Sequence, residues 1–174
     1  MPKYEHFTEA IRTVPDFPKP GIQFIDITTL INKPQLFREV IDIFVEQYRD
    51  KNLDKVVAIE ARGFLFASAL AYQLKVGIVP IRKPGKLPAE TVKETYELEY
   101  GTDSIEIHKD ALSPGDRVLL LDDLLATGGT ASAACRLIQS RQAKIVGVAF
   151  LVELDFLNGR KRLADQELFS ILHY

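Results

Sequence analysis

Cysteine is almost absent from this chain of 174 residues, which carries only Cys135. A single cysteine rules out an intramolecular disulfide and a metal site built from cysteines, and it fits a reducing compartment. Long hydrophobic runs are also missing, since the longest, 145–152, is far shorter than the roughly 20 residues of a membrane-spanning helix. The first six residues contain no apolar stretch of the kind found in secretory signals. We therefore expect a cytoplasmic protein without a membrane partner.

An excess of charge of one sign is missing too. The chain has 22 lysines and arginines against 24 acidic residues, which gives a net charge of −2. Because dedicated nucleic-acid binders usually show a basic face, we expect no nucleic-acid partner. The apolar fraction of 47% is typical of a folded globule. The length predicts a single domain, 1–174, that is large enough to bury a core without disulfides.

Helical and strand patterns alternate between turn-rich segments. The segment 14–21 holds three prolines and a glycine, which predicts that it lacks regular structure. Helices are predicted where apolar residues recur at helical spacing, over 34–48, 64–74 and 130–141. Buried strands are predicted at short apolar runs, over 56–59, 76–81, 118–121, 144–152 and 168–172. Residues 96–107 alternate around Gly101 and predict two antiparallel strands.

This order predicts the α/β class, with a mainly parallel twisted sheet flanked by helices. In such sheets, ligands bind beyond the carboxyl ends of the strands. The segments after 56–59, 76–81 and 118–121 should therefore share one crevice.

The strongest motif follows the strand 118–121 and reads Asp-Asp-Leu-Leu-Ala-Thr-Gly-Gly-Thr over 122–130. Its two glycines let the backbone approach an anion, and N–H groups at the start of the next helix suit a phosphate. Asp122 and Asp123 only accept hydrogen bonds when ionised, so they suit sugar hydroxyls or Mg²⁺. A tight turn with an N-capping threonine and two solvated acids is the simpler alternative. The P-loop and dinucleotide fingerprints, which would offer a rival phosphate site, do not occur in the sequence.

These features resemble the type I phosphoribosyltransferases, whose shared motif is a strand, two acids and a Thr-Gly-Gly-Thr loop. The chain is similar to the members that act on adenine through further segments: Pro-Lys-Pro-Gly at 18–21, Glu-Ala-Arg-Gly-Phe at 60–64, Arg-Lys-Pro-Gly-Lys-Leu-Pro at 82–88 and Leu-Glu-Tyr-Gly at 98–101. The resemblance implies the type I fold with a small N-terminal hood, about 14–30, and a flexible lid, about 83–102. It implies transfer of the phosphoribosyl group from 5-phosphoribosyl pyrophosphate to adenine, giving AMP and pyrophosphate. It also implies a homodimer and Mg²⁺ held mainly by the substrate, without a direct protein ligand.

The resemblance assigns roles to particular residues. The sugar phosphate would be bound by Ala126, Thr127, Gly128, Gly129 and Thr130. The catalytic residues would be Asp122 and Asp123, beside the sugar ring, and Glu99, which handles a proton of a ring nitrogen. Pyrophosphate would be bound by Arg62, Lys86, Tyr100 and Arg82, the last reaching across the dimer. Adenine would be bound by Gln23, Phe24, Ile25 and Leu124.

Simpler alternatives remain open on the residues alone. Phe24 could be a core residue, and the cations at 82–86 could form a solvated turn. Arg62 at a helix start faces the positive end of the helix dipole, which favours an anionic ligand there. Residues 160–162 are expected to be a solvated helix end. Many relatives carry arginine in place of Ile25, which leaves room for another base.

Two rival functions follow from these alternatives. The first is the same transfer to a different base, which the hood residues would decide. The second is a regulator that senses 5-phosphoribosyl pyrophosphate without turning it over. Such regulators usually carry an added DNA-binding domain and a basic surface, and this chain has neither the length nor the charge for them.

Overall fold

The computed structural model describes residues 4–97 and 101–174. Its internal contacts group the chain into two compact units, Met1–Phe44 and Val45–Tyr174, which we call the N-terminal unit and the sheet unit. Across the described ranges, no helix combines the length and the apolar character needed to cross a membrane.

The N-terminal unit is built around a short antiparallel pair of strands. Its elements are α1 (Glu5–Ala10), β1 (Arg12–Pro15), β2 (Gln23–Asp26), α2 (Thr28–Ile31) and most of α3 (Pro34–Tyr48). The prediction that 14–21 lacks regular structure is wrong at its start, because Val14 and Pro15 belong to β1. Pro15 is the last residue of that strand and pairs with Gln23. A proline is tolerated at this end of a two-stranded ladder because its missing N–H breaks few bonds.

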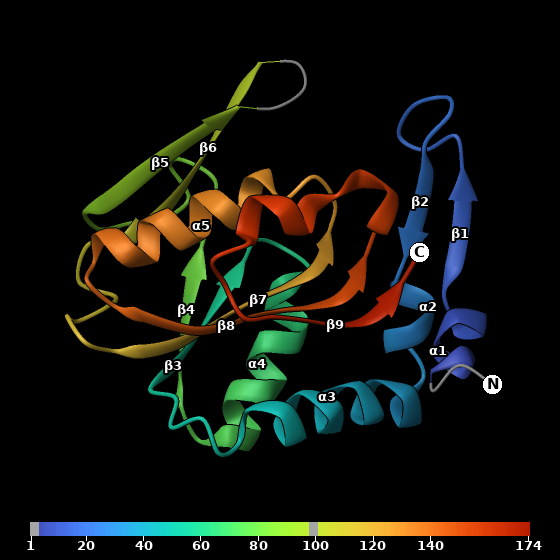
Figure 1. Ribbon diagram of the computed structural model, residues 1–174, viewed down its shortest axis with the longest axis horizontal. Helices are drawn as coiled ribbons and strands as arrows, with labels where there is room; N and C mark the ends of the chain where they lie inside the picture. The colour runs from blue at the N-terminus through green and yellow to red at the C-terminus, as the bar shows by residue number, and fades with distance from the viewer. Residues whose placement is uncertain (1–3, 98–100) are drawn as a thin grey trace. The chain divides into compact units, whose positions relative to one another are not determined.

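The sheet unit contains a five-stranded parallel sheet in the order β4-β3-β7-β8-β9 (Figure 1). Its strands are β3 (Lys55–Ile59), β4 (Gly77–Ile81), β7 (Arg117–Leu125), β8 (Lys144–Glu153) and β9 (Leu168–His173). Helix α4 (Gly63–Leu74) connects β3 to β4, and α5 (Gly129–Ser140) connects β7 to β8. Two short 3-10 helices, η1 (Asp155–Leu157) and η2 (Gly159–Leu163), connect β8 to β9. The predicted α/β class and parallel sheet are therefore confirmed.

The sheet is covered on both faces, as its continuous apolar strands predict. Alternate residues such as Val57 and Leu120 join one core cluster with Leu137 of α5. Their neighbours Val56 and Leu119 are also fully buried and point to the other face. Helix α4 contacts β3, β4 and β7, so it covers that second face (Figure 1). This packing holds the carboxyl ends of the parallel strands together at one end of the sheet.

A separate antiparallel hairpin, β5 (Thr91–Glu97) and β6 (Thr102–His108), packs on α5. Tyr96, Ile105 and Ile107 extend the core cluster from this hairpin. The predicted pairing around Gly101 is confirmed, and β5 begins earlier than expected, at Thr91. Part of the expected lid is thus regular strand, residues 98–100 lie outside the described residues, and the flexibility of the lid stays a prediction.

Candidate active site

A cavity of about 300 Å³ lies at the carboxyl ends of β3, β4 and β7. Its lining comes mainly from three segments, 59–62 at the end of β3, 81–83 at the end of β4, and 122–131 at the end of β7 and the start of α5, with Ile105 of the hairpin in addition. The crevice predicted from the strand order is therefore present, and it joins segments far apart in the sequence.

The two aspartates lie within β7, where the sequence predicted that the strand would end before them. The strand continues because β8 pairs with it as far as Leu125, with Asp122 opposite Phe150. The ladder pairs Asp122 and Leu124, and thereby fixes the backbone on both sides of Asp123. Asp122 also lies against the start of α4, where a Cβ on Gly63 would come within 2.8 Å of its Oδ1. The glycine of the Glu-Ala-Arg-Gly-Phe segment makes this close approach possible.

Asp123 is 5% exposed, and it forms an ion pair with Arg62, whose Nε lies 2.8 Å from its Oδ2. The Asp123 N–H donates to Asp122 Oδ1 at 2.8 Å. Burial raises the pKa of Asp122 well above its ordinary value, and the charge of Asp123 raises it further. Burial also raises the pKa of Asp123, although Arg62 opposes that shift. A positive charge that develops beside this pair would be stabilised, because buried carboxylates lack water to screen them.

Between β7 and α5, the chain forms a loop, 126–128, that we call the phosphate cradle together with the first helical residues Gly129 and Thr130. The N-cap of α5 is Gly128, in the left-handed region at φ +79°, so the threonine-capped alternative is wrong. The first turn of a helix has N–H groups without acceptors in the helix, and its dipole favours an anion. Thr127 is exposed within the lining of the cavity. The cradle can therefore hold a phosphate group.

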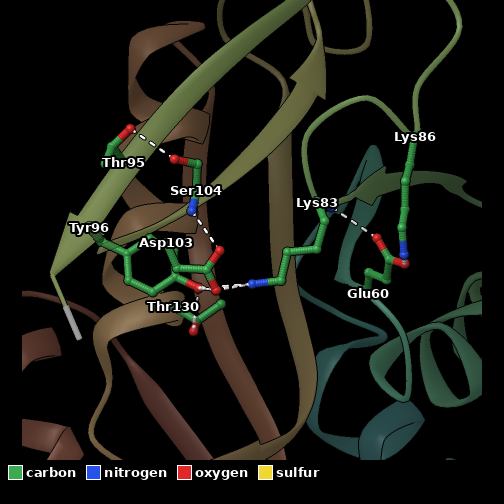
Figure 2. Close-up of polar contacts among 8 residues, drawn as sticks. All are labelled: Glu60, Lys83, Lys86, Thr95, Tyr96, Asp103, Ser104 and Thr130. Carbon is green, nitrogen blue, oxygen red and sulfur yellow. Dashed lines mark hydrogen bonds and ion pairs between the residues drawn. The ribbon is translucent and has the colours of Figure 1, made fainter. Parts of the chain in front are cut away.

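The basic turn after β4 is organised by Glu60, a residue that sequence reasoning missed. The Glu60 carboxylate accepts hydrogen bonds from the Lys83 N–H at 2.9 Å and from Lys86 Nζ (Figure 2). It also accepts one from Arg82 Nη2 at 3.2 Å. Partial burial works against ionisation, but the bonds from Lys86, Lys83 and Arg82 lower the pKa of Glu60 to about 2. One carboxylate thus holds Arg82 and Lys86 beside the cavity, while residues 84–86 stay exposed as in a solvated turn.

A second polar network ties the hairpin to the cradle. Asp103 forms an ion pair with Lys83 and accepts a hydrogen bond from Tyr96 Oη at 3.2 Å (Figure 2). Thr130 Oγ1 donates to Tyr96 Oη at 3.1 Å. Tyr96 and Asp103 are cross-strand partners near the turn between β5 and β6, so this end of the hairpin fixes the side chain of a cradle residue. Strand alternation predicted the hairpin, but nothing local in the sequence indicated these contacts.

The structure brings most of the sequence-predicted residues of the sheet unit together. The cavity is lined by Arg62, Arg82, Asp122, Asp123, Leu124, Ala126, Thr127, Gly128, Gly129 and Thr130. Lys86 reaches it through Glu60. Glu99 and Tyr100 lie outside the described residues.

The predicted base-binding residues Gln23, Phe24 and Ile25 form part of β2 in the N-terminal unit. There, the Phe24 ring meets the Phe17 ring edge-on, with centroids 5.0 Å apart. Ile25 is buried and Gln23 is exposed. The functional roles of these residues stay predictions.

Residues 160–162 are exposed in the last turn of η2, as expected of a solvated helix end, but Arg160 also forms an ion pair that the sequence did not indicate. Its guanidinium donates to both carboxylate oxygens of Glu153, from Nε at 2.9 Å and from Nη2 at 2.6 Å. Glu153 is 3% exposed. A buried acceptor at the end of β8 is thus paired with a cation that stays 46% exposed.

Comparison with known proteins agrees with this geometry. The model of the phosphoribosyl transferase domain family matches residues 26–172. An adenine phosphoribosyltransferase from Solibacter usitatus is 60% identical over 164 residues, covering 94% of this chain and 95% of the relative. The crystal structure of one from Thermoanaerobacter pseudethanolicus is 49% identical, with a TM-score of 0.95, and the match covers 98% of this chain and 99% of that one. One from Saccharomyces cerevisiae, solved with D-2,5-dideoxy-2,5-imino-altritol 1,6-bisphosphate and adenine, is 42% identical, with a TM-score of 0.91 and 97% of each chain covered. The chain therefore belongs to the adenine phosphoribosyltransferase family.

Proposed function

We propose that this chain transfers the phosphoribosyl group from 5-phosphoribosyl pyrophosphate to adenine, giving AMP and pyrophosphate, with the cavity of the sheet unit as the sugar site. One observation carries the proposal. A phosphate cradle, the carboxylates of Asp122 and Asp123 and the arginines Arg62 and Arg82 line a single cavity of about 300 Å³. Each chemical part of the sugar substrate thus has a matching group.

The phosphate end of the sugar would be bound by the cradle. Backbone N–H groups of 127–130 would point at the phosphate oxygens, as at other helix N-termini. Thr127, which is exposed in the cavity lining, would add a hydroxyl donor. At the other end of the substrate, the planar guanidiniums of Arg62 and Arg82 can grip pyrophosphate with paired hydrogen bonds.

During transfer, the bond between C1′ of the ribose and the pyrophosphate oxygen breaks. A ring nitrogen of adenine bonds to C1′, and that nitrogen loses its proton. Positive charge on the ribose ring would be stabilised by Asp122 and Asp123, which also suit its hydroxyls as acceptors. The family resemblance gives the proton to Glu99. This role requires a carboxyl group whose pKa lies near neutrality when the site is closed.

Mg²⁺ fits the site best as an ion carried by the substrate. The carboxylates of the cavity already have partners, since Asp123 pairs with Arg62 and Asp122 accepts an N–H group. Mg²⁺ is usually held by one or two carboxylates together with substrate phosphates. When bound, it would neutralise part of the charge on pyrophosphate. The two aspartates would then act on the ribose rather than as the main metal ligands.

Adenine would be read by Gln23, Phe24, Ile25 and Leu124. A purine needs apolar surfaces for its faces and a few polar groups for its edge. Leu124 is in the cavity lining, and the aromatic side chain of Phe24 is suited to stacking. Since Ile25 replaces a common arginine, recognition at this position would rest on its main chain.

A homodimer in the cytoplasm completes the proposal. An apolar surface on α4 and the edge strand β4 supports the dimer, with Leu65, Tyr72 and Ile78 exposed by 46%, 83% and 43%. Leu65 and Tyr72 are two helical turns apart and so share one side of α4. Light scattering would test the dimer, because Tyr72→Lys should shift the mass toward a monomer. The buried free thiol of Cys135 fits a reducing cytoplasm.

The decisive assay incubates the chain with Mg²⁺, 5-phosphoribosyl pyrophosphate and each nucleobase in turn. We expect AMP from adenine and little nucleotide from the other bases. The double variant Asp122→Asn with Asp123→Asn is the control, and it should fold but lose most of the rate. Binding of the sugar substrate without any nucleotide would favour the regulator, and efficient use of another base would favour a different specificity.

A further inference from the structure

The backbone of the phosphate cradle touches a distant part of the chain at Gly159, without room for a side chain on either partner. A Cβ on Gly128 would lie 2.5 Å from the Gly159 carbonyl oxygen. A Cβ on Gly159 would lie 2.1 Å from the Ala126 carbonyl oxygen and 3.0 Å from the Gly128 nitrogen. The two distances to carbonyl oxygens are far below van der Waals contact, so the close approach requires glycine at both positions.

Gly128 and Gly159 must lack a side chain for different reasons. Gly128 has a φ of +79°, which by itself favours glycine. Gly159 has no positive φ, so an alanine there would meet no backbone strain of its own. Its lack of a side chain serves only the contact with the cradle. Gly159 is also buried, although its neighbours Asn158 and Arg160 are exposed.

The segment that carries Gly159 is fastened to the sheet by a buried carboxylate. Arg160, the next residue, donates to both oxygens of Glu153 at the end of β8. Ser170 of β9 donates to the same carboxylate at 2.6 Å. Burial opposes ionisation, but the hydrogen bonds from Arg160 and Ser170 keep the pKa of Glu153 below its usual value. Two adjacent strands thus hold Arg160 in place.

Further contacts hold the two sides of the same segment. The Leu154 N–H donates to the Leu125 carbonyl at 2.9 Å, just before the cradle begins. The Asp155 N–H donates to the Tyr174 carbonyl at 2.9 Å. Leu163, at the end of η2, is 1% exposed and belongs to the core cluster that includes α5. The segment 155–163 is therefore anchored at both ends, with Gly159 between the anchors.

We propose that Gly159 is a positioning residue for the sugar phosphate: its backbone, held by the Glu153–Arg160 pair, sets the shape of the cradle. The inference rests on the proposed function, because it takes the cradle as the phosphate site. A glycine-rich loop has many accessible conformations. A rigid surface behind it keeps the N–H groups aimed at the phosphate oxygens, and a misplacement of about 1 Å in an active site can cost roughly 100-fold in rate.

The test compares two ligands that use different parts of the cavity. We would measure the affinities for ribose 5-phosphate and for magnesium pyrophosphate by calorimetry, in wild type and Gly159→Ala. The variant should bind ribose 5-phosphate at least tenfold more weakly and pyrophosphate within about twofold of wild type. Gly77→Ala is the matched control, because a Cβ there meets the flexible Lys55 side chain at 3.3 Å, and both affinities should stay unchanged.

A second variant covers the case in which Gly159→Ala does not fold. Arg160→Lys keeps the charge but cannot fork across both oxygens of Glu153. It should weaken the affinity for ribose 5-phosphate about threefold or more and leave the affinity for pyrophosphate unchanged. It should also raise the KM for 5-phosphoribosyl pyrophosphate more than it lowers kcat. Unchanged ribose 5-phosphate affinity in a folded variant, or equal weakening of both ligands, would overturn the inference. If wild type itself neither bound ribose 5-phosphate nor made AMP, the proposed function would fail instead.

Discussion

Arg62 and Asp123 form an ion pair between the segment after β3 and strand β7, with 2.8 Å between Nε and Oδ2. The side chain of Asp123 is 6% exposed, whereas that of Arg62 is 34% exposed. A buried charge is thus balanced by a cation that can still reach solvent and ligand. This pair joins the groups proposed for the sugar ring to those proposed for pyrophosphate.

Arg62→Gln should therefore destabilise the fold as well as abolish transfer. Removing the Arg62 guanidinium leaves the charge of Asp123 buried without its ion-pair partner. We therefore expect a loss of about 1–3 kcal/mol in the free energy of unfolding. Adding Asp123→Asn should recover most of that loss without restoring activity. Urea unfolding of the two single variants and the double variant measures the coupling. A single Arg62→Gln variant as stable as wild type would count against the buried pair.

Asp122→Asn should stabilise the folded protein, in contrast to Arg62→Gln, while still lowering the rate of phosphoribosyl transfer. The pKa of Asp122 is raised in the folded protein, so its ionisation costs stability above its ordinary pKa of 3.8. An amide removes that cost and can still accept the Asp123 N–H. We expect a gain of about 1 kcal/mol at about pH 7 that disappears near pH 3, where both states of the wild type are protonated. Thermal unfolding at the two pH values checks this, and an equal gain at both would refute the assigned cause.

Thr127→Val should weaken binding of ribose 5-phosphate, because it removes a hydroxyl donor from the cradle while keeping a branched side chain. A loss of about three- to tenfold in affinity is expected, measured by calorimetry. Thr95→Val is the control, since Thr95 bonds Ser104 across the exposed face of the hairpin. Equal affinities of the Thr127→Val variant and wild type would argue against direct contact between this hydroxyl and the phosphate.

Glu60→Gln should change how the thermal stability of the protein depends on pH. The pKa of Glu60 is lowered to about 2, so its contribution is fully present above its ordinary value of 4.5 and is lost as pH falls toward 2. Wild type should therefore lose more thermal stability than the variant between about pH 6 and pH 3. Glu167→Gln offers a control on an exposed acid. Parallel curves for wild type and Glu60→Gln would contradict the contacts with Lys86 and Arg82.

The elements whose periodicity is local could be predicted from the sequence. Helix α3 and strands β3 and β8 follow directly from apolar spacing, and the cradle follows from its glycines beside a helix start. The end of β7 was misplaced because pairing with β8, rather than polarity, decides where that strand stops. A polar residue remains in a strand as long as its neighbour supplies the ladder.

Contacts between distant charged residues could not be predicted in this way. Glu60, Glu153 and Arg160 look like surface residues, because charged residues are mostly exposed. The burial of the Glu60 and Glu153 carboxylates depends on partners elsewhere along the chain, such as Lys86 for Glu60 and Ser170 for Glu153. Arg160 stays exposed, and only its pairing with Glu153 was missed. The role of Gly159 could not be predicted either, since only its close contact with the cradle shows why the residue is a glycine.

The most direct test of the account is a crystal structure of the chain with AMP at saturating concentration. We predict that the 5′-phosphate lies within hydrogen-bond distance of the N–H groups of 127–130, with the ribose hydroxyls at Asp122 and Asp123. Density for AMP elsewhere on the chain, with the cradle empty, would contradict it.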